Sequence, residues 1–381
     1  MAAPLLEGVR VLSVGHTLPA MYCIPALVDL GADVTLVEPL LTAEAAGRYA
    51  QLAGLFPTRS LLAGTSRCRI NLKDRRGEAV YLRLAKRSDV VLDGFRPGTT
   101  TRLGIGYDAV QQANPQVIYA AISGYGQEGP AHQRVGHDLN YLAEAGVLEL
   151  TGHPGATPAI PGVPVADGLT GLNAALNLVA ALWQRSKTVR GCFLDLAIID
   201  SPLFLMAMEL DFFRQTGHAR RRGDTHLSGG YAWYQVFETK DGRHLSVAAV
   251  EPHFYKRLCE LVGRPDLVER QFGDGAERDA LRQVFGRIFR ARTSAEWLQL
   301  LENEDVCVAL VRDTADAASG AHLRRLQCEA EDGGAPLVRS PVRLPRAPLA
   351  APRDTAASLA HYGFAAEEIR ALEAAGCIAA A

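Results

Sequence analysis

The sequence predicts an α/β protein in which a large domain with a Rossmann-like parallel sheet is followed by a smaller α+β domain. Three observations support this prediction. In the first part of the chain, short apolar runs alternate with helical segments, as they do in strand–helix–strand units. Near residue 217 a basic linker begins, and hairpin signals follow it. With 381 residues, 48% of them hydrophobic, the chain is long enough to build more than one core.

The first strand–helix–strand unit comes at the start of the chain. Val9 to Gly15 is an apolar, β-branched run, and Pro19 to Leu30 has a proline in its first turn and Gly31 after its end. Asp33 to Val37 is the next strand. Strands joined through a crossover helix run parallel. The first strand-to-helix turn lacks the G-x-G-x-x-G spacing of dinucleotide sites, so no nicotinamide or flavin cofactor is expected.

The same alternation continues through the large domain. Its further expected elements are a helix at 77–88, a strand at 90–95, a helix at 107–113, a strand at 117–123, helices at 141–150 and 169–184, a strand at 192–197 and a helix at 202–215. The most apolar long run, 196–213, is interrupted by Asp200, Pro202 and Glu209, which favours a buried helix over a membrane span.

The predicted domains are 1–216 for the large α/β domain, 217–312 for the small α+β domain, and 313–381 for a return segment whose C-terminal helix packs on the large domain. The small domain opens with a hairpin, because a Lys-Asp-Gly turn joins two strand-like runs. The expected elements from here on are strands at 231–239 and 245–250 and helices at 252–262, 280–291, 294–302 and 365–375.

Composition narrows the function. A net charge of −2 and a pI near 6.6 do not call for a nucleic-acid or membrane partner. The seven cysteines are scattered singly, without metal-like spacing, which predicts reduced thiols, no metal site and a cytoplasmic location. The N-terminus lacks the basic and apolar regions of a signal peptide, so none is expected.

An imidazole and a carboxylate thirty residues apart are the main candidates for chemistry. His137 stands in Gly-His-Asp-Leu-Asn-Tyr (136–141), and Asp167 immediately precedes a long helical run. An aspartate at that place is a helix N-cap, but a helix N-terminus also stabilises a developing anion. A lone histidine is more often structural than catalytic, and Asp138 is expected to cap the helix that follows it. These local patterns leave both a proton-transfer site and a purely structural role open.

Other polar groups allow the same two interpretations. Glu251 lies between a strand and a helix, where an acid favours the helix dipole. Arg96 follows a strand, at the end of a parallel sheet where ligands bind, and could meet a phosphate or remain a solvated turn residue. A basic cluster could steer a polyanion or be a solvated face; it consists of Arg67, Arg69, Lys73, Arg75 and Arg76.

Five sequence segments together resemble a known family, although no single motif among them is sufficient to identify it. They are Leu-Glu-Gly-Val-Arg-Val-Leu (6–12), Leu-Gly-Ala-Asp-Val-Thr-Leu-Val-Glu-Pro (30–39), Gly-Phe-Arg-Pro-Gly (94–98), Arg-Leu-Gly-Ile-Gly-Tyr (102–107) and Asn-Pro-Gln-Val-Ile-Tyr-Ala-Ala-Ile-Ser-Gly-Tyr-Gly-Gln-Glu-Gly-Pro (114–130). Together they resemble the class III CoA-transferase superfamily (CaiB/BaiF type), which includes α-methylacyl-CoA racemases. The resemblance implies an interlocked homodimer with each active site between the large domain of one chain and the small domain of the other. It also implies an acyl-CoA substrate, with no metal and no cofactor beyond the CoA moiety.

The resemblance also assigns roles to residues. Transferases of this superfamily use an aspartate nucleophile that forms a mixed anhydride, and Asp167 falls at that position. Racemases pair the aspartate with the histidine of Gly-His-Asp-x-Asn-Tyr, here His137, and carry an acid matched by Glu251 in Ala-Ala-Val-Glu-Pro-His-Phe (248–254). The implied CoA contacts are Arg96, Arg102, Glu38, Gly94, Phe95 and Leu72.

The leading expectation is epimerisation at the α-carbon of a 2-methyl-branched acyl-CoA, with CoA transfer between carboxylic acids as the alternative and a non-catalytic acyl-CoA-binding protein as the third. Asp-Gly-Leu-Thr-Gly (167–171) is closer to the transferase form of that motif. Two segments, 40–46 and 64–69, depart from the usual phrases, as does Gly94, where transferases usually carry asparagine. These departures bear on the CoA contacts and on the choice between the two reactions.

Overall fold

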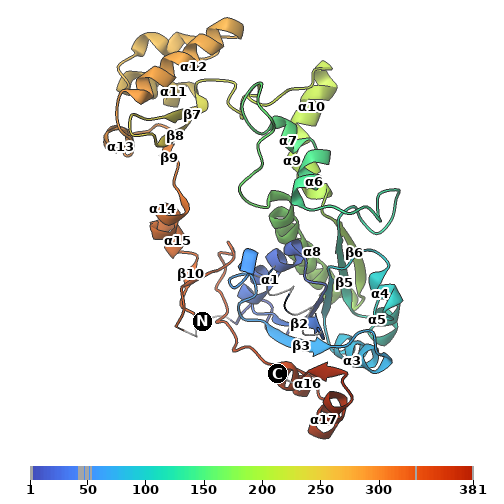
Figure 1. Ribbon diagram of the computed structural model, residues 1–381. Coiled ribbons are helices and arrows are strands. Elements are labelled where there is room, and N and C mark those ends of the chain that lie inside the picture. The colour runs from blue at the N-terminus through green and yellow to red at the C-terminus, as the bar shows by residue number, and fades with distance from the viewer. Residues whose placement is uncertain (1–2, 42–46, 48–50, 52–53, 331–332, 380–381) are drawn as a thin grey trace. The chain divides into compact units, whose positions relative to one another are not determined.

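The computed structural model describes residues 3–41, 47, 51, 54–330 and 333–379. The chain separates into two compact units (Figure 1). The sheet unit consists of Met1–Glu144, Val163–Phe204 and His322–Ala381, and the small unit of Ala145–Gly162 and Leu205–Ala321. These bounds differ from the expected domains, because 145–162, 205–216 and 313–321 group with the small unit. Two ion pairs join the first two of these segments to the linker: Arg222 binds Glu149 at 2.9 Å, and Arg220 binds Glu209 at 3.4 Å.

A seven-stranded sheet with the order β12-β3-β2-β1-β4-β5-β6 forms the centre of the sheet unit. Neighbouring strands are parallel except β12, which is antiparallel to β3. After β3 the chain returns to the other side of β1, so the winding reverses between β1 and β4. The predicted mostly parallel α/β sheet is confirmed. The strands are β1 (Arg10–Val14), β2 (Asp33–Pro39), β3 (Ser66–Ile70), β4 (Val90–Asp93), β5 (Ile118–Ser123), β6 (Cys192–Ala197) and β12 (Ile378–Ala379).

Helices cover both faces of this sheet. On one face α3 (Arg75–Lys86) and α5 (Tyr107–Ala113) share a core with alternate strand residues such as Leu12 and Val14. On the other face α1 (Leu18–Asp29) packs along α8 (Val165–Thr188). The remaining helices of the sheet unit are α4 (Thr99–Arg102), α6 (Asp138–Glu144), α9 (Asp200–Leu205, which ends in the small unit), α15 (Ala321–Arg324), α16 (Thr355–His361) and α17 (Ala366–Ala374).

A glycine allows α1 and α8 to approach each other closely. A Cβ placed on Gly171 would lie 2.4 Å from the Tyr22 Cβ and 2.7 Å from the Pro19 carbonyl oxygen, so no larger residue fits without moving a helix. By length and composition α8 could also cross a membrane. One of its faces, from Ala166 to Leu182, is buried within the protein, which is typical of a core helix.

The C-terminal segment returns to the sheet unit (Figure 1). Its helix α16 lies against β3, and its last strand, β12, pairs with β3. Upstream, a short ladder forms between β10 (Gln327–Cys328) and β11 (Leu337–Val338). Beyond β11, Arg339 pairs with the buried carboxylate of Asp29, to which the Ser340 hydroxyl also donates at 2.6 Å. A buried ion pair therefore anchors the return segment to the end of α1.

The small unit has a three-stranded antiparallel sheet, β7-β8-β9, packed against helices. The predicted hairpin is confirmed, and Gly242 has the positive φ of 73° that its tight turn requires. Stacked rings of Phe237, Phe285 and Phe289 lie in the core. The elements are α7 (Val147–Leu150), α10 (Ala207–Thr216), β7 (Tyr234–Glu238), β8 (His244–Ala248), α11 (Pro252–Leu261), the 3-10 helix η1 (Pro265–Arg270), α12 (Gly275–Arg290), α13 (Ser294–Leu301), β9 (Val308–Leu310) and α14 (Thr314–Ser319).

Several local expectations need correction. The helix expected at 141–150 is split into α6 and α7 by Gly146, whose φ of 88° a continuous helix cannot contain. The helix expected at 202–215 is likewise two helices, α9 and α10. The helix expected from Leu169 begins four residues earlier, at Val165, because a side chain from α6 caps its first turn. The pairing of β3 with β12 was not predicted.

Candidate active site

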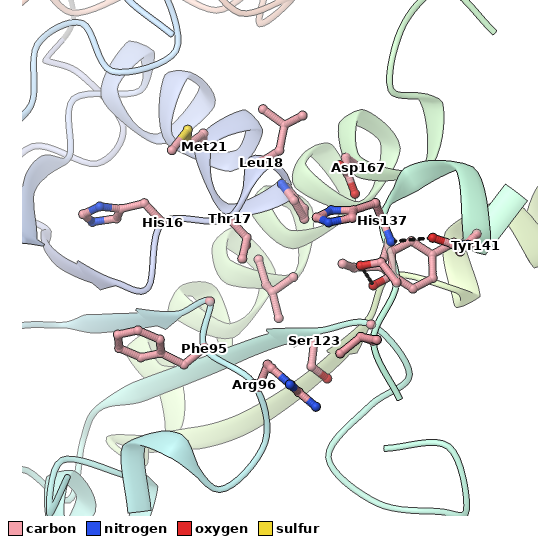
Figure 2. Close-up of a pocket in the computed structure, with 18 of the residues that line it drawn as sticks. His16, Thr17, Leu18, Met21, Phe95, Arg96, Ser123, His137, Tyr141 and Asp167 are labelled. Atoms are coloured by element: carbon pink, nitrogen blue, oxygen red, sulfur yellow. Dashed lines mark hydrogen bonds between the residues drawn. The ribbon is translucent and has the colours of Figure 1, made fainter. Parts of the chain in front are cut away.

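A pocket of about 820 Å³ lies where the carboxyl ends of β1, β4, β5 and β6 meet (Figure 2). This is the point at which the winding of the sheet reverses, the usual ligand site of open α/β sheets. Its volume falls within the roughly 300–1,000 Å³ of small-molecule sites. The lining comes from the segments that follow those strands, together with the start of α6 and of α8: residues 16–19, 21, 56, 58, 94–97, 122–124, 132, 134–137, 140, 141, 167 and 198.

The loops after β1 and β4 touch each other beside this pocket. Gly15 has a φ of 69°, and a Cβ on Gly94 would lie only 1.8 Å from the Gly15 carbonyl oxygen. Position 94 can therefore hold only glycine in this arrangement. The asparagine that transferases usually carry there would require a different path for one of these loops.

Asp93 organises the Phe-Arg-Pro loop that follows β4. Its buried carboxylate accepts hydrogen bonds from the Phe95 N–H at 2.8 Å, the Tyr119 hydroxyl at 2.9 Å and the Thr100 hydroxyl at 3.1 Å. Burial raises the pKa of Asp93, and these three donors oppose that effect. The loop is thus held by a carboxylate inside the core, and it presents Arg96 to the pocket.

Asp167 occupies the third position of α8 and is not its N-cap, which corrects the sequence expectation. Its carboxyl group lines the pocket, although the residue is only 8% exposed. Within the described residues, no group donates a hydrogen bond to that carboxyl. Burial, and next the negative charge of Asp138, raise the pKa of Asp167 to about 7. At neutral pH this side chain can therefore both hold and release a proton.

His137 lies at the start of α6 and is exposed in the same pocket. Its carbonyl accepts from the N–H groups of Asn140 and Tyr141, and its own N–H donates to the Asn140 side chain at 3.0 Å. This is the side-chain-to-backbone half of a capping box, with His137 as the capping residue. Figure 2 draws His137 and Asp167 at the same end of the pocket, away from His16 and Phe95.

The rest of the Gly-His-Asp-Leu-Asn-Tyr motif holds this histidine in place. The Tyr141 hydroxyl donates to the Gly136 carbonyl at 2.8 Å, and a Cβ on Gly136 would lie 2.9 Å from the Tyr141 ring. The expectation that Asp138 caps its own helix is wrong. Its side chain accepts the N–H of Asp167 at 3.0 Å and so caps the first turn of α8.

The pocket brings together some of the residues expected to contact CoA. Arg96, Gly94 and Phe95 line it, and the Arg96 guanidinium donates to the Gln133 carbonyl at 2.8 Å. The other three expected contacts are not among its described lining residues: Glu38 pairs with Arg67 and Arg69, Arg102 donates to the Thr99 hydroxyl, and Leu72 packs against the core. Of the segment 40–46 that departs from the family phrase, residues 42–46 lie outside the described residues.

Glu251 belongs to the small unit, where it occupies the N-cap position of α11 without a side-chain cap bond. The expected basic cluster on the sheet unit is partly neutralised, since Glu38 pairs with two of its members and Arg76 pairs with Asp74 at 2.8 Å. Among the described residues, no three His, Cys, Asp or Glu side chains gather where a metal ion could be held.

His16 is a pocket residue that sequence reasoning missed. It follows β1, and burial lowers the pKa of its imidazole, which keeps the ring neutral. Its Nε2 lies 3.3 Å from the Ser13 carbonyl oxygen, an atom that can only accept, so Nε2 carries the hydrogen and Nδ1 is left as an acceptor. The one sequence feature that could have identified His16 as a pocket residue is its place in the first strand-to-helix turn.

Comparison with known proteins identifies the family. The family model described as CoA-transferase family III matches residues 6–356.

The chain belongs to this family.

Its relatives include enzymes of two kinds. It is 32% identical to the α-methylacyl-CoA racemase of Mus musculus over 375 residues, 96% of this chain and 95% of that protein. It is 31% identical to the succinyl-CoA–L-malate CoA-transferase beta subunit of Chloroflexus aurantiacus over 346 residues, 87% of this chain and 85% of that protein. A CaiB/BaiF family protein from Brucella suis shares the fold, with a TM-score of 0.79 at 24% identity over 94% of this chain and 99% of that one. The chain is therefore an enzyme, an acyl-CoA racemase or a CoA-transferase.

Proposed function

We propose that this family III enzyme epimerises the α-carbon of a 2-methyl-branched acyl-CoA by transferring protons between His137 and Asp167. The observation that carries the proposal is the state of the Asp167 carboxyl. It shares a pocket with an exposed imidazole, and its pKa of about 7 lets it act as an acid in one direction and as a base in the other. A similarity to racemases over 96% of the chain supports the same choice.

The proposed reaction uses one proton shared by the two side chains. In one direction the Asp167 carboxylate removes the α-proton, and the electron pair of the broken C–H bond moves onto the thioester oxygen as an enolate. Protonated His137 then delivers its proton to the opposite face of the α-carbon as the electron pair returns to form the new C–H bond. Asp167 ends protonated and His137 neutral, which is the state that the opposite enantiomer requires.

General acid–base catalysis of this kind contributes on the order of 10²–10⁴-fold. The rest would come from donors aimed at the enolate oxygen. The N–H of Gly168 is not free for this role, because it donates to the Pro164 carbonyl inside α8 at 3.0 Å. Two groups remain available to stabilise the enolate oxygen. One is the positive end of the α8 dipole. The other is the Arg96 guanidinium, through the N–H groups that do not donate to the Gln133 carbonyl.

The small unit would complete the site in an interlocked homodimer. There, Glu251 of one chain would hydrogen-bond His137 of the other, which would set the imidazole tautomer and raise its basicity. A Glu251→Gln variant should then lose kcat while KM changes little. An unchanged kcat would remove Glu251 from the proposal.

CoA transfer between carboxylic acids is the second candidate, supported by relatives such as the acetyl-CoA:oxalate CoA-transferase of Acetobacter aceti, 28% identical over 350 residues. There the Asp167 carboxylate would attack the thioester carbonyl and release the CoA thiolate, forming a mixed anhydride. One observation weighs against it: the loop at Gly94 has no room for the asparagine side chain that transferases usually carry there.

One experiment distinguishes the two reactions. A single enantiomer of a 2-methylacyl-CoA is incubated with the enzyme in D₂O, with and without a free acceptor acid. Deuterium entering the α-carbon without acceptor, together with loss of optical purity, is the expected result. CoA that moves only when acceptor is present, with hydroxylamine trapping an acyl group on Asp167, would refute the proposal in favour of transfer.

Matched variants test the two bases. Asp167→Asn and His137→Gln should each reduce interconversion of the two enantiomers by at least about 10²-fold, because inversion needs both bases. Glu128→Gln changes an exposed carboxylate elsewhere in the sheet unit and should leave exchange unchanged. Near-full interconversion of the enantiomers in either of the first two variants would rule out the two-base mechanism.

A further inference from the structure

The N-terminal ends of α6 and α8 are joined by a single side chain. Asp138, in the first turn of α6, accepts the backbone N–H of Asp167 in the first turn of α8, at an N···O distance of 3.0 Å. Both residues are at least partly buried. The acceptor of this hydrogen bond is itself a carboxylate, so a negative charge is held beside a second, buried carboxyl group.

A helix N-terminus normally favours an ionised acid, because the free N–H groups and the dipole stabilise negative charge. Asp167 stands at that position, yet its pKa is raised to about 7. Burial is the larger cause and the Asp138 charge the second. Asp138 also occupies the N–H that would otherwise stabilise an anion at this end of α8.

We infer that Asp138 is a positioning residue that controls the reactive carboxyl: its side chain anchors the Asp167 backbone, and its negative charge favours retention of the proton on Asp167. This inference deepens the proposed function and rests on it for its catalytic meaning. The Gly-His-Asp motif would then supply, in adjacent residues, one of the two bases and the group that adjusts the proton affinity of the other.

The other groups around Asp167 do not supply a competing charge. Tyr22 of α1 and Tyr141 of α6 face it, and burial, together with nearby negative groups, raises the pKa of both phenols, that of Tyr141 to about 12, so both are neutral. His137, at the start of α6, is the other base of the pair.

Two arginines line the pocket, and one of them is paired with a carboxylate. Arg134 pairs with Glu144 at 2.5 Å, and Arg96 donates to the Gln133 carbonyl. His16, from the loop after β1, is kept neutral by burial. Neither arginine is among the causes of the raised pKa of Asp167, whereas the charge of Asp138 is.

The inference is tested by titrating Asp167 directly. The infrared C=O band of a protonated carboxyl, identified as the band lost in Asp167→Asn, is followed against pH in the full-length enzyme. In the wild type its midpoint should lie near 7. Asp138→Asn keeps an acceptor oxygen but removes the charge, and should lower the midpoint by at least about one pH unit. Asp138→Ser, also neutral and able to cap a helix, is the second variant.

Glu128→Gln is the control, because it removes an exposed carboxylate of the sheet unit that does not line the pocket. It should leave the midpoint unchanged. An unchanged midpoint in both Asp138 variants, or an equal shift in Glu128→Gln, would overturn the inference.

The pH profile gives a second readout that a purely structural role would not move. The acidic limb of kcat/KM for α-deuterium exchange reports the protonation of the coupled pair, and it should shift to lower pH in Asp138→Asn. If no variant or wild type exchanges deuterium while the infrared midpoint still shifts, the proposed function fails and the control of Asp167 by Asp138 stands.

Discussion

Replacing Asp167 with asparagine should stabilise the folded protein at the same time as it inactivates it. The pKa of Asp167 in the folded state, about 7, is above the ordinary value of 3.8, so the folded state binds a proton that the unfolded state has already released. This group therefore contributes no penalty below about pH 4, a growing penalty as the pH rises, and its full penalty above about pH 7. An asparagine cannot ionise and does not carry this penalty.

The size of the effect follows from the shift. A change from 3.8 to about 7 is worth at most about 4 kcal/mol at 1.36 kcal/mol per pKa unit, and contact of the carboxyl with water in the pocket reduces this to about 2–3 kcal/mol at pH 8. By the same linkage, about two fifths of the penalty is present at pH 5. Because no described residue donates a hydrogen bond to this carboxyl, the substitution breaks none.

Urea unfolding of the wild type and Asp167→Asn at pH 5 and pH 8 is the assay, with the free energy of unfolding taken from the midpoint and slope. The advantage of the variant should grow by about 1–2 kcal/mol between the two pH values. Glu128→Gln, an exposed carboxyl-to-amide change, should show no such growth. An advantage that is absent, or equal at both pH values, would refute the raised pKa and with it the main support for the proposed mechanism.

Three further substitutions test the structure around the site. Gly171→Ala should lower stability by about 1–3 kcal/mol in urea unfolding, because its Cβ would lie 2.4 Å from the Tyr22 Cβ. Gly168→Ala, whose Cβ would have nothing within 4 Å, should be neutral or stabilising by up to about 1 kcal/mol. Equal effects of the two substitutions would contradict the close helix contact. Asp29→Asn should lower the free energy of unfolding by about 3 kcal/mol, because it leaves Arg339 buried without its charged partner. It should also expose the return segment to trypsin, and a cleavage pattern like that of the wild type would contradict this. Asn140→Ala should cost about 1 kcal/mol, measured as a lower Tm, through loss of the hydrogen bond from the His137 N–H; no change in Tm would show that this capping bond adds no stability.

Periodicity and helix signals were sufficient for the elements of the sheet unit. Apolar runs such as Val9 to Gly15 and helical segments such as Pro19 to Leu30 appear in the structure as β1 and α1 with shifts of one residue at each end. Elements stabilised by partners far along the chain were not predicted. The strand β3 alternates buried and exposed residues, but it is flanked by parallel β2 and by β12 from the opposite end of the chain.

For the site, the sequence by itself determined which residues to consider. The Gly-His-Asp-Leu-Asn-Tyr phrase and the aspartate before a long helix singled out His137 and Asp167, and the resemblance singled out the family and its chemistry. The structure adds that both residues line one pocket.

Only the tertiary structure decided the proton affinity of the Asp167 carboxyl and the role of Asp138. Local sequence made Asp167 an N-cap and Asp138 the cap of the next helix, because a cap is normally a matter of residues within one turn. In the folded chain the cap comes from another helix, twenty-nine positions away in sequence. The proton affinity of Asp167 depends on burial and on that neighbour, and both arise only when α1, α6 and α8 pack together.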